Sequence, residues 1–236
     1  MRRFSPLIAL AATLLIAGCV PTPPSPTTAP SGATSGPTVD FVGNSSCPTD
    51  NTTSYNSGHA PATNGTGAPV GQAIPEMPHN HVAPPTTVTY MHDPPTSGCH
   101  YSIPSGGGQS APVTPGVYDQ AVDPEYWVHN LEHGYIAVLY NCPSGCATEF
   151  NQLHSWYKSL APDPQLQSSC PSAYGLSAPY AKVIVVPDTT MSVKFAVVSW
   201  DWYDGMSKGL DINEVQRFYD NHVDQGPEQS NGVSPC

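Results

Sequence analysis

Residues 123–140 read DPEYWVHNLEHGYIAVLY and run from a helix start to the end of a strand. Asp123 before Pro124 is typical of a helix N-terminus, because the N–H that proline lacks at the first helical position would have no helical partner anyway. Gly134 predicts the end of this helix, since glycine readily takes the left-handed backbone of a C-terminal cap. Residues 135–140 are apolar almost without interruption, which predicts a central strand.

Segments on both sides of this unit predict three more strands and two more helices. β-Branched and aromatic residues indicate strands at 86–91, 182–186 and 193–200. Apolar residues at helical spacing indicate a helix over 147–160, and Asp211 with Glu214 resembles the capping box of a last helix. This order of elements predicts an α+β domain with a small mixed, mainly antiparallel sheet and about three helices, loop-rich and stapled by disulfides.

The N-terminus has the parts of a bacterial export signal. Arg2 and Arg3 precede an apolar stretch at 7–16 that is too short to span a bilayer comfortably. The stretch ends in Ile-Ala-Gly-Cys, which resembles a lipobox, a motif whose cysteine is acylated and becomes the mature N-terminus. We therefore expect a lipoprotein signal peptide at 1–18 and a palmitate-type lipid on Cys19. An ordinary secretory signal with an incidental cysteine is the alternative.

The next part of the chain has the composition of a linker. Residues 20–40 contain 14 Pro, Ser or Thr in 21 positions and one charged residue, Asp40, so they cannot bury a core. We expect residues 19–75 to form a Pro/Ser/Thr-rich disordered tether and arm, and residues 76–236 to form the globular domain. Cys47 is the point at which we expect the arm to be held against the domain.

Composition excludes several classes of protein. Seven Lys and Arg against 18 Asp and Glu give a net charge of -11 at pH 7, which leaves too little positive charge to neutralise many phosphates of a nucleic acid. No long apolar run follows the signal, which argues against a multispanning membrane protein. We expect a monomeric protein of the cell envelope that is anchored to a membrane by its lipid and faces outward, on the outer membrane if the host has one.

Histidines are the richest source of candidate chemistry. His129 and His133 stand four residues apart and so share one helix face. His81 and His100 flank the first predicted strand, and His100 follows the turn-forming PPTSG. Neutral imidazole suits zinc and copper alike, so these four histidines predict a zinc or copper site, with no organic cofactor. In the alternative interpretation they only hold the fold together, His133 by bonding the free carbonyls of its own helix end.

The same helix also matches a pattern of zinc peptidases. Residues 129–133 read HNLEH, the H-x-x-E-H arrangement in which two histidines bind zinc and the glutamate, here Glu132, activates water. Gly134 argues against it, because those enzymes place the motif inside a long helix. If Glu132 is not catalytic, we expect it either to orient an imidazole from outside the metal shell or to face solvent.

Three blocks resemble a bacterial family called domain of unknown function 3105. They are residues 93–100 (DPPTSGCH), 116–118 (GVY) and 128–134 (VHNLEHG). The resemblance covers about residues 79–229. It implies the limits of the domain and favours His81, His100, His129 and His133 as the histidines that matter, but it implies no reaction.

Six cysteines remain besides Cys19: Cys47, Cys99, Cys142, Cys146, Cys170 and Cys236. An even number in an exported chain predicts three disulfides. Cys142 and Cys146 could instead form a soft metal pair for copper. Because Cys47 and Cys236 lie outside the core implied by the family resemblance, we expect them to pair with each other. For the others we expect Cys146–Cys170 and Cys99–Cys142.

Three classes of function follow from the sequence. The first is a membrane-anchored lipoprotein with a histidine-rich zinc or copper site. The second is a structural or interaction lipoprotein without catalysis, and the third is a zinc-dependent hydrolase that uses the H-x-x-E-H segment. The sequence names no substrate and no protein partner.

Overall fold

The structure is a computed structural model that describes residues 39–47, 70–103, 109–228 and 235–236. The predicted signal peptide, Cys19 and most of the predicted tether lie outside these residues. The described part of the chain contains four helices: α1 (Pro124–Glu132), α2 (Ala147–Ser159), α3 (Cys170–Ala173) and α4 (Ile212–His222). None of them is long and apolar enough to cross a membrane.

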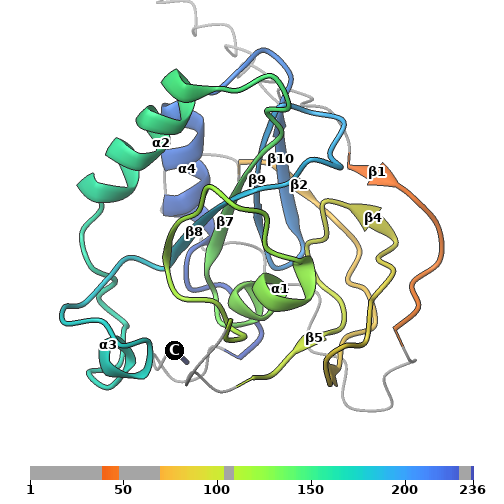
Figure 1. The fold of residues 1–236 in the computed structure, drawn as a ribbon, viewed down its shortest axis with the longest axis horizontal. Coiled ribbons are helices and arrows are strands. Elements are labelled where there is room, and N and C mark those ends of the chain that lie inside the picture. The colour runs from red at the N-terminus through yellow and green to blue at the C-terminus, as the bar shows by residue number, and fades with distance from the viewer. Residues whose placement is uncertain (1–38, 48–69, 104–108, 229–234) are drawn as a thin grey trace, which may run out of the picture. The chain divides into compact units, whose positions relative to one another are not determined.

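A six-stranded mixed sheet forms the centre of the domain (Figure 1). Its strands, in spatial order, are β2 (Gln72–Ala73), β10 (Trp202–Met206), β9 (Phe195–Ser199), β7 (Ile136–Tyr140), β8 (Val183–Pro187) and β6 (Gly116–Val117). The pairs from β2 to β7 are antiparallel, and β8 is parallel to both β7 and β6. The expected α+β class, with a mixed and mainly antiparallel sheet, is confirmed.

Strand β7 is central because both of its faces are buried. Ala137 and Leu139 belong to the apolar cluster that includes Leu131 of α1, whereas Ile136 and Val138 belong to the cluster beneath α2 and α4. Figure 1 shows α2 and α4 next to each other, away from α1. A strand covered on both faces needs apolar residues at every position, which explains the unbroken run in the sequence.

The end of α1 is stabilised by contacts from distant parts of the chain. Gly134 has a φ of 79°, as predicted for a left-handed cap, and the N–H groups of Gly134 and Tyr135 donate to carbonyls of Leu131 and Asn130. Two further carbonyls at this helix end also accept hydrogen bonds. Glu228 donates its N–H to the Glu132 carbonyl, and Asp224 donates its N–H to the Gly134 carbonyl.

A buried lysine completes this cap. Lys182, the residue immediately before β8, is fully buried and donates from Nζ to the His133 carbonyl at 2.8 Å. Its charge is paired with Asp224 at 3.1 Å. Gly226 must lie close to the helix end, since a Cβ there would stand 2.3 Å from the Glu132 carbonyl oxygen. The tail 224–228 is thereby held against α1.

The N-terminal half is built from short ladders and loops. Strand β1 (Asp40–Phe41) pairs with β4 (His92–Asp93), and β3 (His81–Val82) runs parallel to β5 (His100–Tyr101). Strands β1 and β2 precede residue 76, so parts of the segment expected as a tether and arm pair with the domain.

One predicted strand is absent from the structure, and one strand of the structure was not predicted. Residues 86–90 are not a strand. The N–H of Val88 donates to Glu125 Oε1, and the carbonyl of Thr89 accepts from the N–H of Ser46, so these backbone groups do not form a continuous β-ladder with one neighbouring strand. Strand β10 was missed, because Asp204 and Gly205 interrupt its apolar pattern. The helices predicted at 124–133, 147–160 and after Asp211 are confirmed to within one residue or two.

The three expected disulfide pairings are wrong, although the expected six cysteines do form three disulfides. The pairs are Cys47–Cys99, Cys142–Cys146 and Cys170–Cys236. Cys47 reaches Cys99 because the arm runs beside residues 89–93, where the N–H of Ser46 donates to the Thr89 carbonyl. Cys142 and Cys146 meet across one tight loop, in which the N–H of Gly145 donates to the Cys142 carbonyl.

We predict that the Lys182→Met substitution lowers the free energy of unfolding by about 3–5 kcal/mol, because it leaves the Asp224 carboxylate buried without its cation. Lys194→Met is the matched control. It removes a lysine whose side chain is 45% exposed and pairs with Glu149, so a loss of less than about 1 kcal/mol is expected. Urea unfolding followed by tryptophan fluorescence measures both, and equal losses would contradict the cap.

Candidate metal centre

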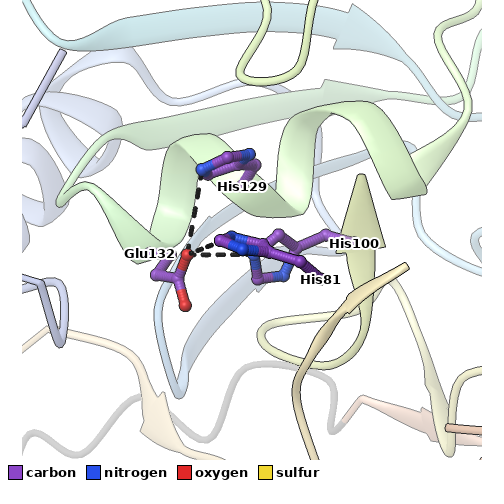
Figure 2. A group of neighbouring side chains, drawn as sticks. All are labelled: His81, His100, His129 and Glu132. Carbon is purple, nitrogen blue, oxygen red and sulfur yellow. Dashed lines mark hydrogen bonds and ion pairs between the residues drawn. The ribbon is translucent and has the colours of Figure 1, made fainter. Parts of the chain in front are cut away.

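Two short strands and one helix bring the candidate residues together. In the parallel register of β3 and β5, His81 lies opposite His100, so both imidazoles leave the ladder on the same side. Helix α1 supplies His129 and Glu132, which are three residues apart and share one face. Figure 2 shows the three imidazoles gathered around one carboxylate oxygen of Glu132.

The distances define a compact cluster. Oxygen Oε2 of Glu132 lies 2.9 Å from Nε2 of His100, 3.4 Å from Nε2 of His81 and 3.9 Å from Nε2 of His129. His100, His129 and Glu132 are buried, whereas the side chain of His81 is 47% exposed. The cluster is thus enclosed on the protein side and reaches solvent at His81.

Backbone carbonyls fix the orientation of two of the rings. Nδ1 of His100 donates to the Gly98 carbonyl at 2.8 Å, and Nδ1 of His129 donates to the Tyr101 carbonyl at 2.6 Å. A carbonyl can only accept, so Nδ1 carries the proton in each ring. In the neutral form of these imidazoles, Nε2 therefore presents a lone pair to the cluster, as a metal ligand must.

The charges of the cluster are strongly coupled. Burial alone would raise the pKa of Glu132, but its hydrogen bonds with His100 and His81 outweigh burial and hold the pKa of this carboxyl well below its usual range. Burial lowers the pKa of His129 to about 3, aided by charge on His133 and His100. The hydrogen bond with Glu132 raises the pKa of His81.

The spacing of the four ligand atoms fits a metal ion. They all lie within 4.8 Å of one another. A tetrahedral zinc with bonds of about 2.0–2.1 Å holds its ligand atoms roughly 3.3 Å apart, which is close to the distances from Glu132 Oε2. A cation at the centre would also separate the inward nitrogen lone pairs of His100 and His129 from the carboxylate that they face.

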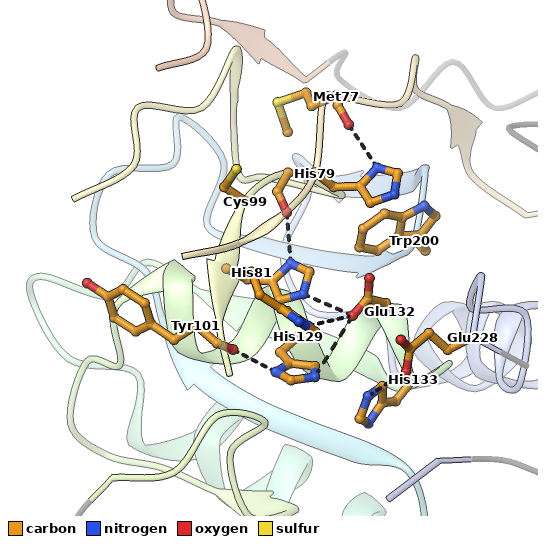
Figure 3. Close-up of polar contacts among 12 residues, drawn as sticks. Met77, His79, His81, Cys99, Tyr101, His129, Glu132, His133, Trp200 and Glu228 are labelled. Atoms are coloured by element: carbon orange, nitrogen blue, oxygen red, sulfur yellow. Dashed lines mark hydrogen bonds and ion pairs between the residues drawn. The ribbon is translucent and has the colours of Figure 1, made fainter. Parts of the chain in front are cut away.

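His133 occupies a neighbouring position (Figure 3). Its ring lies 4.5 Å from that of His129, but its Nε2 is 3.1 Å from Glu228 Oε2, and with Glu132 and Glu228 it forms a second group at ligand spacing. Three of the four predicted imidazoles, those of His81, His100 and His129, form one group with Glu132, whereas His133 belongs to the neighbouring group.

Sequence reasoning underestimated two residues. Glu132 was expected outside the metal shell or in solvent, although its position three residues after His129 was a signal that it shares that helix face. Glu228 was not foreseen, because it comes from the tail, far from the helix in sequence. The site forms because β5 packs against α1, whereas β7, the strand that follows this helix, pairs with β8 and β9.

Other histidines have separate structural partners. Nδ1 of His92 bonds the Pro94 carbonyl at 2.8 Å, Nε2 of His222 bonds the Val70 carbonyl at 2.7 Å, and the His79 ring meets the Trp200 ring edge to face. His154 stacks on Phe150 of α2. His59 lies outside the described residues.

Comparison with known proteins identifies the family. The model of a family described as "Protein of unknown function (DUF3105)" matches residues 81–234. This match spans well over half of the chain, so the chain belongs to that family, as the sequence blocks predicted. Neither a curated protein nor a solved structure matches this chain. All members of the cluster, and Glu228, lie within the matched region.

We predict that His129 and His81 titrate on opposite sides of 6.5, the ordinary histidine pKa, in metal-free protein. His129 should stay neutral down to about pH 3, so the stability it contributes is present above pH 6.5 and is lost as the pH falls from 6.5 towards 3. His81 has a raised pKa, so its contribution is present below pH 6.5 and is lost as the pH rises through that raised value. NMR titration of the ring C–H signals, assigned with His129→Gln and His81→Gln, checks both. Coincident midpoints near 6.5 would contradict the geometry.

Proposed function

We propose that this protein is an exported lipoprotein, anchored to a membrane through Cys19, whose domain binds one zinc or copper ion. The ligands are Nε2 of His81, His100 and His129 and Oε2 of Glu132. One observation carries the proposal: three imidazole nitrogens approach a single buried carboxylate oxygen at 2.9, 3.4 and 3.9 Å. A metal ion is the partner that satisfies all four atoms at once.

In the alternative without a metal ion, protons must lie between the imidazole nitrogens and Oε2 of Glu132. His100 and His129 already use Nδ1 to bond carbonyls, so each could donate to Glu132 only as a charged imidazolium. The low pKa of His129 opposes that charge. A purely structural role for the histidines therefore leaves at least one buried nitrogen lone pair facing the carboxylate, whereas a bound cation removes this repulsion.

The donor set suits binding better than hydrolysis. Catalytic zinc sites keep three protein ligands and an open position for water, but here four protein atoms surround the centre. Glu132 stands among the ligand atoms and so is not free to act as a base. His133, the second histidine of H-x-x-E-H, is directed to Glu228. These contacts favour a metal-binding protein over the zinc hydrolase.

The membrane anchor rests on the sequence. The basic residues, the short apolar stretch and the lipobox before Cys19 support export and acylation. Two or three acyl chains give stable attachment, whereas a single chain binds membranes only marginally. The domain would then face outward in the cell envelope, on the outer membrane where the host has one.

We predict that the purified protein binds one equivalent of zinc or copper, measured by elemental analysis after dialysis against each ion in turn. His100→Ala and His129→Ala should each reduce the affinity by more than the 10–100-fold that partners outside the metal shell typically contribute, because they remove ligands. His133→Ala should stay within that range. His154→Ala is the matched control and should bind normally. Full binding by His100→Ala and His129→Ala would refute the site.

We predict that Cys19→Ser prevents membrane attachment of the full chain. In a bacterial host, labelled palmitate should enter the wild-type protein, which should sediment with membranes. The serine variant should take up no label, because it has no thiol at position 19 to acylate, and its signal peptide should not be cleaved. Cys47→Ser controls for the loss of a cysteine as such. Equal labelling of wild type and Cys19→Ser would disprove the anchor.

A further inference from the structure

We propose that the disulfide Cys142–Cys146 is a redox site that oxidises cysteine pairs of other exported proteins by thiol–disulfide exchange. It lies apart from the candidate metal centre. The cysteines follow the C-terminal end of β7, whereas α1, which carries His129 and Glu132, leads into the opposite end of that strand. The two sites can therefore be tested separately.

The position of the pair in the fold is the first argument. The loop 141–146 joins β7 to α2, and α2 leads on to β8, which lies parallel to β7. In open sheets with helices on both faces, reactive groups gather beyond the carboxyl ends of such parallel strands. Paired cysteines beside a βαβ unit are also the arrangement typical of thioredoxin-like redox proteins, here with three residues between them rather than two.

The second argument is the different electrostatic surroundings of the two sulfurs. Cys146 is the N-cap residue of α2, a helix of 13 residues, and its own side chain makes no capping hydrogen bond. The positive end of the helix dipole stabilises a thiolate there. Cys142 has no comparable helix end, so Cys146 is the better leaving group of the pair.

The third argument is the contrast with the other two disulfides. Cys99 and Cys170 are fully buried, and their bridges close separations of 52 and 66 residues. Cys142 and Cys146 are both partly exposed and close a separation of only 4 residues. Closing so short a loop removes little entropy from the unfolded chain, so this bridge adds least to stability.

The surface around the pair leaves room for an incoming thiol. Residues 143–145 between the cysteines are exposed, and a Cβ built on Gly145 would meet nothing within 4 Å. Both cysteines line a largely apolar hollow of about 240 Å³ together with Tyr140 and Phe150. The side chains that flank a cysteine of the partner protein can occupy it.

The exchange balances in two steps. A partner thiolate attacks Sγ of Cys142, a mixed disulfide forms, and Cys146 leaves as a thiolate. The second thiolate of the partner then attacks the partner sulfur atom of the mixed disulfide, and Cys142 leaves as a thiolate. The partner pair loses two electrons and becomes a disulfide, and Cys142 and Cys146 become a dithiol that takes up the two protons.

Glutathione is the probe for the first test. The purified protein is equilibrated in buffers of fixed reduced-to-oxidised glutathione ratio, quenched with acid, alkylated and mapped by mass spectrometry. We expect Cys142–Cys146 to be half reduced at a ratio at least tenfold less reducing than either of the other disulfides requires, and the mixed disulfide to form on Cys142. Reduction together with the other bridges, or a mixed disulfide mainly on Cys146, would overturn the proposal.

Thiolate absorbance at 240 nm separates a redox site from a disulfide that is merely exposed. In Cys142→Ser, the remaining Cys146 should ionise with a pKa below 8.5, the ordinary cysteine value. In Cys146→Ser, Cys142 should ionise near that ordinary value. Similar pKa values in the two variants would contradict the role of the helix end.

Discussion

The buried carboxylate of Glu132 is the constraint on which the candidate site depends. It is 3% exposed and faces three imidazole nitrogens, two of them on rings already committed to carbonyls through Nδ1. An isolated charge in such surroundings would be expensive, and buried charges are normally paired or coordinate metals. The rest of the domain holds these groups in place, since α1 is fixed at its end by Lys182 and by the tail.

Helix α1 also organises the loop-rich half through its polar side chains. Glu125 accepts from the N–H of Val88, and the side-chain amide of Asn130 bonds both the N–H and the carbonyl of Val113. His129 bonds the Tyr101 carbonyl. These hydrogen bonds hold segments with little regular structure against the helix. They also hold β5 against α1, so that His100 lies next to Glu132. The packing of these segments and the candidate chemistry therefore both depend on this one helix.

Local signals in the sequence were enough to predict the helix and strand of residues 123–140. The Asp-Pro start, Gly134 and the apolar run of β7 act within a few residues of one another, and the structure has the elements they predict. His129 and His100 could be named because one lies on a predicted helix and the other after a rigid turn. The disulfides Cys47–Cys99 and Cys170–Cys236, and the positions of Lys182 and Glu228, could not be predicted, because long-range folding brings these residues to their partners. Strand 86–91 failed for the same reason: its groups bond the arm and α1 rather than a sheet neighbour.

X-ray absorption spectroscopy of the metal-loaded protein tests the central claim most directly. The account predicts a first shell of nitrogen and oxygen at about 2.0–2.1 Å, with the outer-shell scattering of three imidazoles. It predicts two imidazoles in His100→Ala if that variant is forced to bind at high metal concentration. A sulfur shell at about 2.3 Å, or one imidazole or none in the wild-type protein, would show that the metal is held elsewhere and that Glu132 and its histidines are not the site.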